Sequence, residues 1–331
     1  MNPDVIEMRE LLTAMIRARV FTQRAFNLQR QGRAGTVAPL TGEEAVVVGA
    51  AAALDPEVDF VFPQYREHAG LERFGEEVFR KYILAVRGHP DGGRFDTARV
   101  HPIQIALAAQ IPHAVGMAWG FQRLGHPGVA LVFFGDGASS EGDFYEAGNL
   151  AGVLRAPVVF VCVNNGWAIS TPRSRQTAAA SFADKAVGFG FPGVEIDGND
   201  VVAVREAVRA ARDRALAGNG PTLIEAHTYR LGPHTTSDDP TRYVPPEELA
   251  AAQRRDPISR LAHDLEVLGA WSAADTTAAE DAATKRANDV IDWSDTVALE
   301  PDAFFDHVFA EPTPRMERQR DELLAHLREV G

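Results

Sequence analysis

Two short, continuous apolar stretches stand out near the middle of the chain. Gly128–Phe134 reads GVALVFF, and Pro157–Val163 reads PVVFVCV. An uninterrupted apolar run of this length is typical of a strand that is covered on both faces of its sheet. The stretch between them, Asp143–Leu154, has the spacing of a helix. The pattern therefore predicts a strand, a helix and a second strand in succession.

Three further stretches extend this alternation. Asp59–Phe62 is a short strand before Pro63, GVEID (193–197) is another, and Pro221–Tyr229 follows the helical pattern of Val201–Leu216. Strands that alternate with helices favour a parallel sheet. We therefore predict an α/β fold with a doubly wound, mainly parallel sheet flanked by helices.

Helical spacing also dominates both ends of the chain. Residues 40–54 carry Thr41 and, three positions later, Glu44, which predicts a capping box at the start of a helix. A single domain over 1–331 is expected, with an N-terminal helical arm (about 1–35), a core (about 36–243) and a helical C-terminal extension (about 244–331). The other predicted helices are Pro3–Arg30, Ile103–Leu124 (kinked or restarted at Pro112), Ile258–Leu268, Ala273–Ile291, Phe304–Phe309 and Met316–Val330.

Composition narrows the classes of function. The 331 residues are 45% hydrophobic and carry a net charge of −13, which argues against a nucleic-acid-binding surface and against binding to anionic membranes. The single cysteine, Cys162, can form neither an internal disulfide nor a Cys-rich zinc site. No apolar run approaches 18 residues and the N-terminus lacks a signal-peptide pattern, so a cytoplasmic protein without a membrane helix is expected.

Polar residues follow the two central strands directly. Gly135-Asp136-Gly137 comes after the first strand, and Asn164-Asn165-Gly166 after the second. A right-handed crossover would bring both ends to one edge of the sheet, where ligands bind in open α/β folds. A carboxylate and an amide oxygen suit Mg²⁺, which completes its shell with water and phosphate oxygens. Glycines and the amides of the following helix suit a diphosphate. Asp-Gly and Asn-Gly also favour plain tight turns, but their paired order favours a metal and diphosphate site.

These motifs resemble a known family. GDG followed by 26 residues and NN is the pattern of thiamine-diphosphate enzymes, and the wider sequence is similar to the alpha subunits of 2-oxo acid dehydrogenases of the branched-chain and pyruvate type. The resemblance covers nearly the whole chain. It includes QGRAGTVAPLTGEEAVVVGAAAAL, QYREHAG, LAAQIPHAVGMAWG, FGDGASSEGDFYEAGNLAG, NNGWAISTP, VEIDGNDVVAV and YRLGPHTTSDDPTRY.

The resemblance implies roles for individual residues. Magnesium would be bound by Asp136, Asn165 and the backbone carbonyl of Trp167, and His234 would be the catalytic residue near the thiazolium ring and the substrate carboxylate. A histidine can transfer a proton or, once protonated, stabilise a carboxylate. The remaining implied residues are Tyr65 and Arg66 at the diphosphate, Leu107 beside the aminopyrimidine, Gly135, Gly137, Ala138 and Ile169 along the cofactor, and Arg230, Asp238 and Tyr243 as residues that order the loop carrying His234.

The implied activity is oxidative decarboxylation of a 2-oxo acid, with transfer of the acyl group to the lipoyl domain of an acyltransferase core. QYRE and TSDDP favour a branched-chain substrate, while pyruvate and acetoin stay open. Thiamine catalysis also needs a carboxylate against the aminopyrimidine. Glu43 and Glu44 are interpreted as capping residues, Glu141 lies at the diphosphate end, and the context of Glu225 matches no such role. The resemblance implies that a beta subunit supplies this carboxylate, in an α₂β₂ heterotetramer.

The chain departs from the family pattern in several places. Gly92–Pro102 does not align with a stretch that carries a histidine in relatives, and His101 is one candidate to replace it. Some relatives hold a monovalent cation with Ser and Thr hydroxyls, and Gln104 and Ala109 at the corresponding positions argue against such a site here. Thr235 stands where mitochondrial relatives carry a regulatory phosphoserine, and we interpret it as a loop residue.

Two other functions are compatible with parts of the sequence. GFGFPG (188–193) matches the dinucleotide fingerprint, but it follows a helical stretch and precedes a strand, whereas an NAD-binding motif needs the reverse order. A non-catalytic subunit that keeps the fold is the second rival. The presence of Asp136, Asn165, Arg66 and His234 argues against it.

Overall fold

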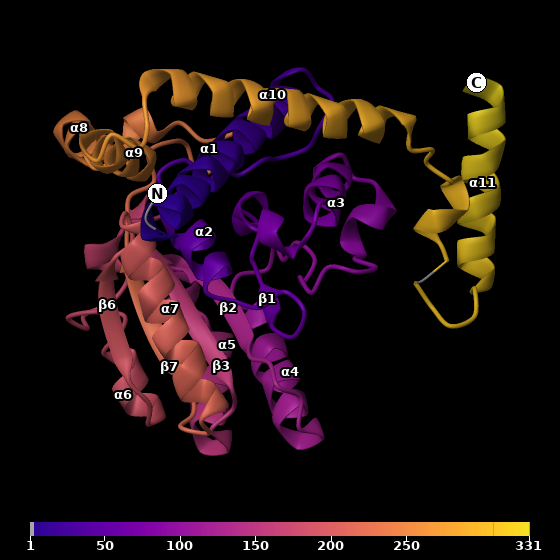
Figure 1. The fold of residues 1–331 in the computed structure, drawn as a ribbon. Coiled ribbons are helices and arrows are strands. Elements are labelled where there is room, and N and C mark those ends of the chain that lie inside the picture. Colours follow the sequence, from indigo (N-terminus) through magenta and orange to yellow (C-terminus); the bar gives the residue numbers. More distant parts are fainter. Residues whose placement is uncertain (1–2, 307, 331) are drawn as a thin grey trace.

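The computed structural model describes residues 3–306 and 308–330, and a parallel β-sheet lies at its centre (Figure 1). The sheet has five strands in the order β1-β2-β3-β7-β6, and every neighbouring pair is parallel. All five strands expected from the sequence form, which confirms the α/β prediction. Their bounds are Phe60–Phe62 (β1), Ala130–Gly135 (β2), Val158–Asn164 (β3), Gly193–Asp197 (β6) and Thr222–His227 (β7).

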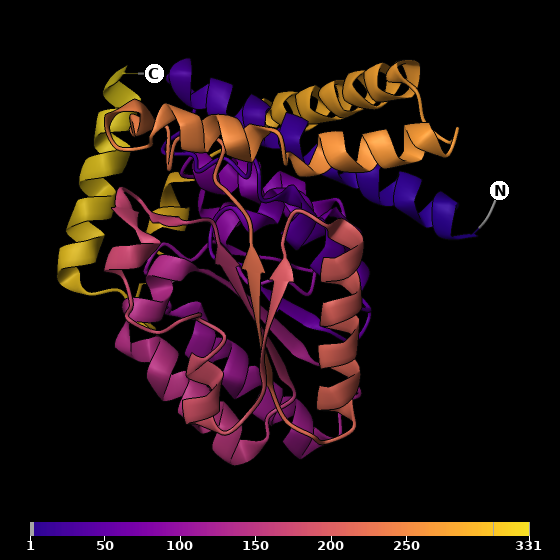
Figure 2. The same ribbon diagram turned by 90° about the vertical axis from the view of Figure 1, so that its left-hand side faces the viewer.

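Helices cover both faces of this sheet, as Figure 2 shows. Alternate residues of the central strands point to opposite sides, so Phe133 and Val161 join one apolar cluster while Phe134 and Phe160 join the other. Burial on both faces explains the continuous apolar runs. Helices α2 (Glu44–Ala52), α3 (Glu77–Val86) and α7 (Val201–Leu216) pack on the first side, and α4 (Gln110–Leu124), α5 (Gly142–Leu154) and α6 (Lys185–Phe189) pack on the second.

Helices from the N-terminal and C-terminal parts of the chain pack together above the sheet. The long N-terminal helix α1 packs against α9 and α10, and α11 lies apart from the sheet at the right of Figure 1. None of the helices in the described part of the chain is long and apolar enough to cross a membrane. The bounds are Pro3–Arg30 (α1), Pro246–Gln253 (α8), Pro257–Val267 (α9), Ala273–Thr296 (α10) and Pro314–Val330 (α11).

The predicted capping box is wrong. Helix α2 begins at Glu44, and no side chain caps its first turn. The Glu44 carboxylate accepts the backbone N–H of Gly42 at 2.9 Å and is paired with Arg19 at 2.7 Å. Because Glu44 is completely buried, a cationic partner stabilises its charge better than a reciprocal cap would.

Two other helix predictions need correction. Helix α4 begins at Gln110 rather than near Ile103, and Pro112 lies in its first turn, where its missing N–H costs nothing. The interval 304–309 is no regular helix in its described residues. Phe304 ends a 3-10 turn that begins at Pro301, and position 307 lies outside the described residues. The expected division into arm, core and extension stays a prediction.

The glycine-rich match GFGFPG runs from the last two residues of α6 to the first residue of β6. It therefore follows a helix and precedes a strand, the reverse of a dinucleotide-binding turn. This order disfavours the NAD-binding alternative.

Candidate functional site

One cavity of about 780 Å³ opens at the carboxyl ends of β2 and β3. Segments far apart in the sequence line it, as expected of a binding site in an open α/β fold. Every site residue expected from the sequence is among its walls: Tyr65, Arg66, Leu107, Gly135, Asp136, Gly137, Ala138, Asn165, Trp167, Ile169 and His234.

The two strand ends bring Asp136 and Asn165 together. Asp136 is the first residue after β2, and a backbone hydrogen bond from Asn165 stabilises its carboxylate. Both side chains are buried. Burial raises the pKa of Asp136 above its ordinary value, although hydrogen bonds from Gln176 and Asn165 and the charge of Arg230 oppose the rise. The side-chain partner of this carboxylate is the neutral amide of Gln176, at 2.5 Å. A buried carboxylate held by neutral donors is suited to a cation.

Arg230 braces the loop that follows Asn165. Its guanidinium donates to the carbonyl of Trp167 at 3.3 Å and to the carbonyl of Ile169 at 2.8 Å. It also donates to the hydroxyl of Tyr243 at 2.7 Å. Ile169 has φ = 55°, a conformation that a β-branched residue rarely adopts. Arg230 thus fixes a strained loop whose Trp167 carbonyl is one of the expected metal ligands.

Arg66 and His234 form the opposite wall. Arg66 is buried and donates to the carbonyls of Pro39 at 2.7 Å and His234 at 3.0 Å. Nη2 of Arg66, which donates to the carbonyl of His234, also lies 2.7 Å from Nδ1 of that residue. Burial, together with the charges of Arg66 and Arg230, lowers the pKa of His234 to about 3. Because an arginine only donates, Nδ1 must accept, and the neutral ring carries its proton on Nε2.

The loop that carries His234 is held by hydrogen bonds. Asp238 accepts the backbone N–H of His234 at 2.7 Å and the hydroxyl of Tyr243 at 2.6 Å. Arg230 reaches Asp238 only through Tyr243, and Asp239 instead accepts from Thr241. The Tyr243 hydroxyl therefore bridges Arg230 and Asp238.

Glycine serves two different needs beside Asp136. A Cβ on Gly137 would lie 2.8 Å from the Cβ of Ala168, so a larger residue would push the two loops apart. A Cβ on Gly135 would meet no atom within 4 Å, which leaves the backbone open to the cavity. A 3-10 turn, Asp136–Ser140, then leads into α5, whose first helical residue is Gly142. The helix begins one residue before the expected Asp143 and follows this loop directly.

Glu43 is a cavity residue that the sequence interpretation missed. It is buried and accepts from Nδ2 of Asn165 at 3.0 Å, while Oδ1 of Asn165 accepts the backbone N–H of Trp167. Burial, with a contribution from Glu67, raises the pKa of Glu43 to about 7, although Arg66, Arg230 and Asn165 oppose the rise. The sequence does not distinguish Glu43 from Glu44, since both stand at the start of a helix and both are interpreted there as capping residues. The structure places Glu43 in the cavity and pairs Glu44 with Arg19.

Of the unaligned segment Gly92–Pro102, Gly92 and Gly93 line the cavity. His89, which precedes this segment, also lines the cavity, and its Nε2 lies 3.1 Å from the carbonyl of Ala298. His101 is not among the lining residues; its ring stacks on Phe62 at 5.1 Å. The candidate replacement of the family histidine by His101 is therefore not supported. Thr235 lines the cavity beside His234, and its phosphorylation stays untested.

Comparison with known protein families gives a consistent match. The family model described as "Dehydrogenase E1 component" matches residues 12–300. A relative from Mycobacterium tuberculosis (strain ATCC 25618 / H37Rv), named 3-methyl-2-oxobutanoate dehydrogenase subunit alpha, is 45% identical over 97% of this chain and 87% of its own. A relative from Staphylococcus aureus (strain Mu50 / ATCC 700699), named pyruvate dehydrogenase E1 component subunit alpha, is 43% identical over 82% of this chain and 74% of its own. These matches confirm the resemblance seen in the motifs.

Proposed function

This chain belongs to the dehydrogenase E1 component family as an oxidoreductase subunit of the 2-oxo acid dehydrogenase alpha type, and from that premise we propose that its cavity holds thiamine diphosphate and Mg²⁺. One observation carries the proposal. Side chains from the ends of two neighbouring strands and from two distant loops converge on one cavity, with the donor types that both groups require.

The residues present fit these groups. Asp136, Asn165 and the carbonyl of Trp167 offer three hard oxygen donors, the kind that Mg²⁺ prefers. The buried Asp136 carboxylate has a neutral side-chain partner, so a cation would relieve the cost of its burial. Arg66 and Tyr65 would bind the diphosphate, and the open backbone at Gly135 leaves room for it. Leu107, Ala138 and Ile169 would line the organic rings.

When bound, thiamine diphosphate supplies a thiazolium ring that accepts the electron pair released as a 2-oxo acid loses CO₂. The task of the chain is to orient groups and manage protons. Neutral His234 would donate a hydrogen bond from Nε2 to the substrate carboxylate, because Arg66 occupies Nδ1 as a donor. The depressed pKa of His234 keeps the ring neutral over the working pH range.

We propose a branched-chain 2-oxo acid as the substrate, with pyruvate or acetoin as the alternative. Support comes from the QYRE and TSDDP motifs and from a relative at 45% identity whose name specifies 3-methyl-2-oxobutanoate. A panel of decarboxylation rates on the reconstituted complex tests this choice. The branched-chain acids should give the highest kcat/KM, and a higher value for pyruvate or acetoin would overturn it.

We further propose that a beta subunit completes the site in an α₂β₂ heterotetramer that serves a lipoyl-bearing acyltransferase core in the cytoplasm. Glu43, the acid newly found in the cavity, is engaged by Asn165 at the metal end, so the carboxylate for the aminopyrimidine is still expected from a partner. Ile105, which lines the cavity, is 70% exposed. On α4, Trp119 is 46% exposed, and a Cβ on Gly116 or Gly120 would meet no atom within 4 Å, so this helix has a surface on which a partner could pack.

Assembly can be tested with the isolated chain. Purified alone with thiamine diphosphate and Mg²⁺, it should not decarboxylate a 2-oxo acid in the presence of an artificial electron acceptor. The same chain co-expressed with its beta subunit should be active. Equal turnover in both preparations would refute the shared site and make Glu43 the candidate for the activating carboxylate.

A further inference from the structure

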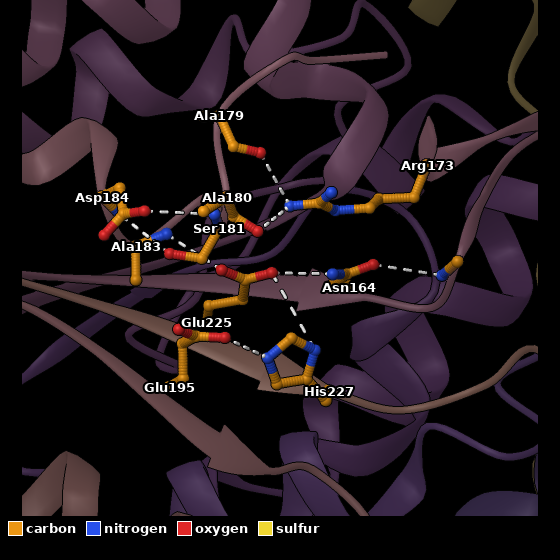
Figure 3. A network of polar contacts seen from close by, with 11 residues as sticks. Asn164, Arg173, Ala179, Ala180, Ser181, Ala183, Asp184, Glu195, Glu225 and His227 are labelled. Carbon is orange, nitrogen blue, oxygen red and sulfur yellow. Dashed lines mark hydrogen bonds and ion pairs between the residues drawn. The ribbon is translucent and has the colours of Figure 1, made fainter. Parts of the chain in front are cut away.

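A second polar cluster lies at the carboxyl ends of β6 and β7, outside the cavity described above. Glu225 and His227 are two residues apart on β7, so their side chains leave the same face of the sheet. Glu195 on β6 is the register partner of Glu225 and points to that face as well. Strand register alone therefore brings two carboxylates and one imidazole together (Figure 3).

We propose that Glu195, Glu225 and His227 bind a divalent transition-metal ion of the Zn²⁺ type. One ligand atom from each of the three side chains lies within 4.8 Å of the others. Nε2 of His227 is 2.8 Å from Oε2 of Glu195, and its Nδ1 is 3.9 Å from Oε1 of Glu225. One imidazole and two carboxylates, with water completing the shell, suit zinc better than magnesium.

The buried member of the cluster is already oriented. Glu225 is completely buried, and its two oxygens accept from Nδ2 of Asn164 at 2.7 Å and from the backbone N–H of Ala183 at 2.9 Å. Each oxygen keeps a lone pair for a metal. Such partners fix the direction of a ligand and strengthen its binding. Glu195 and His227 are half-exposed and can move the short distance that coordination requires.

The surroundings leave room for the ion and its water. A cavity of about 630 Å³ adjoins the cluster and shares no lining residue with the catalytic cavity. The guanidinium of Arg173 donates to the carbonyls of Ala179 and Ala180, as Figure 3 shows, and Asp197 is paired with Arg260 at 2.5 Å. Among the described residues, Glu195 and Glu225 form ion pairs with His227 and with no lysine or arginine, so their negative charge is available for a cation.

A metal here would link the edge strand β6 to β7. In the sheet order β6 pairs with β7 alone, so its end has no other strand to hold it. The same ion would bind Glu225, whose other partner, Asn164, directly precedes the expected magnesium ligand Asn165. The inference concerns these three side chains and does not depend on the proposed function.

Zinc titration of the whole chain tests the inference. A tag-free preparation, stripped of metal and titrated calorimetrically with ZnCl₂, should bind one equivalent, with X-ray absorption showing one imidazole nitrogen and oxygen ligands. His227→Gln and Glu195→Gln change half-exposed side chains and should each weaken binding by about tenfold or more. His263→Gln, an exposed histidine elsewhere, and Asp136→Asn, in the catalytic cavity, should bind as the wild type does.

Two results would overturn it. Absence of zinc binding to the wild type is one. The other is an isotherm for His227→Gln that matches the wild type in affinity and stoichiometry, which would assign the bound zinc to other residues. Circular dichroism of each variant establishes that the comparison is between folded proteins.

Discussion

Two replacements of Arg230 should distinguish the stability that comes from its positive charge from the stability that comes from its hydrogen-bond geometry. Its guanidinium makes two short hydrogen bonds, at 2.8 Å to Ile169 and 2.7 Å to Tyr243, and two longer ones at 3.3 Å to Trp167 and Gly232. A hydrogen bond from a charged donor contributes about 1.5–3 kcal/mol. Lysine keeps the positive charge but lacks the planar guanidinium that donates to several acceptors at once. Arg230→Lys should therefore lower the free energy of unfolding by about 2 kcal/mol. Arg230→Met loses every bond and should lower it by about 4 kcal/mol, partly offset as Ile169 relaxes from its strained φ.

Urea denaturation of the two variants measures this loss, and calorimetric titration measures binding of thiamine diphosphate with Mg²⁺. Both variants should bind the cofactor more weakly, because the Trp167 carbonyl is no longer fixed. Arg242→Met is the matched control, an exposed arginine of the same loop, and should leave both quantities unchanged. If Arg230→Lys kept the wild-type unfolding midpoint and cofactor affinity, the bracing role of Arg230 would be refuted.

Three further predictions concern protonation and loop order. Glu43 has a folded pKa of about 7 against an ordinary value of 4.5, so the stability it contributes is present below pH 4.5 and is lost as the pH rises through 7. In urea titrations, the free energy of unfolding of Glu43→Gln should therefore rise by about 3 kcal/mol relative to that of the wild type as the pH goes from 4 to 9. A difference between the two proteins that does not change with pH would contradict the burial argument. His68 is completely buried and its pKa is lowered to about 4, so its contribution to the free energy of unfolding changes with pH in the opposite direction. The unfolded chain takes up a proton below pH 6.5, so the wild type should lose about 2 kcal/mol between pH 8 and pH 5 relative to His68→Asn; parallel pH profiles would exclude a buried neutral ring. Protease cleavage within Arg230–Tyr243 should fall when thiamine diphosphate and Mg²⁺ are added, and equal cleavage with and without them would count against ordering of this loop by the cofactor.

The strand ends were predictable because two local signals agreed. Continuous apolar runs marked β2 and β3 as buried parallel strands, and parallel strands joined by a helix end at one edge. Asp136 and Asn165 could therefore be brought together from sequence alone. Arg66 and His234 lie on loops, where no periodicity operates, and only the family resemblance pointed to them.

Glu43 shows why part of the site could not be predicted. A glutamate at the start of a helix satisfies helix-end chemistry whether it is exposed or buried, so sequence cannot separate a capping residue from a cavity residue. The apolar spacing of 103–109 similarly indicated a helix. Ala108, at φ = 64°, does not have a helical backbone there, and a hydrophobic pattern does not report such a conformation.

The cluster at Glu195, Glu225 and His227 depended on strand order. GVEID and the later strand were both recognised as strands from their sequence. Their direct pairing follows from the insertion of β7 between β3 and β6, which leaves β6 at the edge. Only this register brings Glu195 and Glu225 opposite each other.

Binding of thiamine diphosphate by an Asp136→Ala variant tests the central claim most directly. The variant, co-expressed with the beta subunit, should keep the wild-type circular dichroism spectrum yet lose Mg²⁺-dependent binding of thiamine diphosphate. Asp143→Ala, an exposed acid in the first turn of α5, should bind the cofactor as the wild type does. Cofactor affinity in Asp136→Ala equal to that of the wild type, with the same response to Mg²⁺, would contradict the assignment of the metal to the carboxyl ends of β2 and β3.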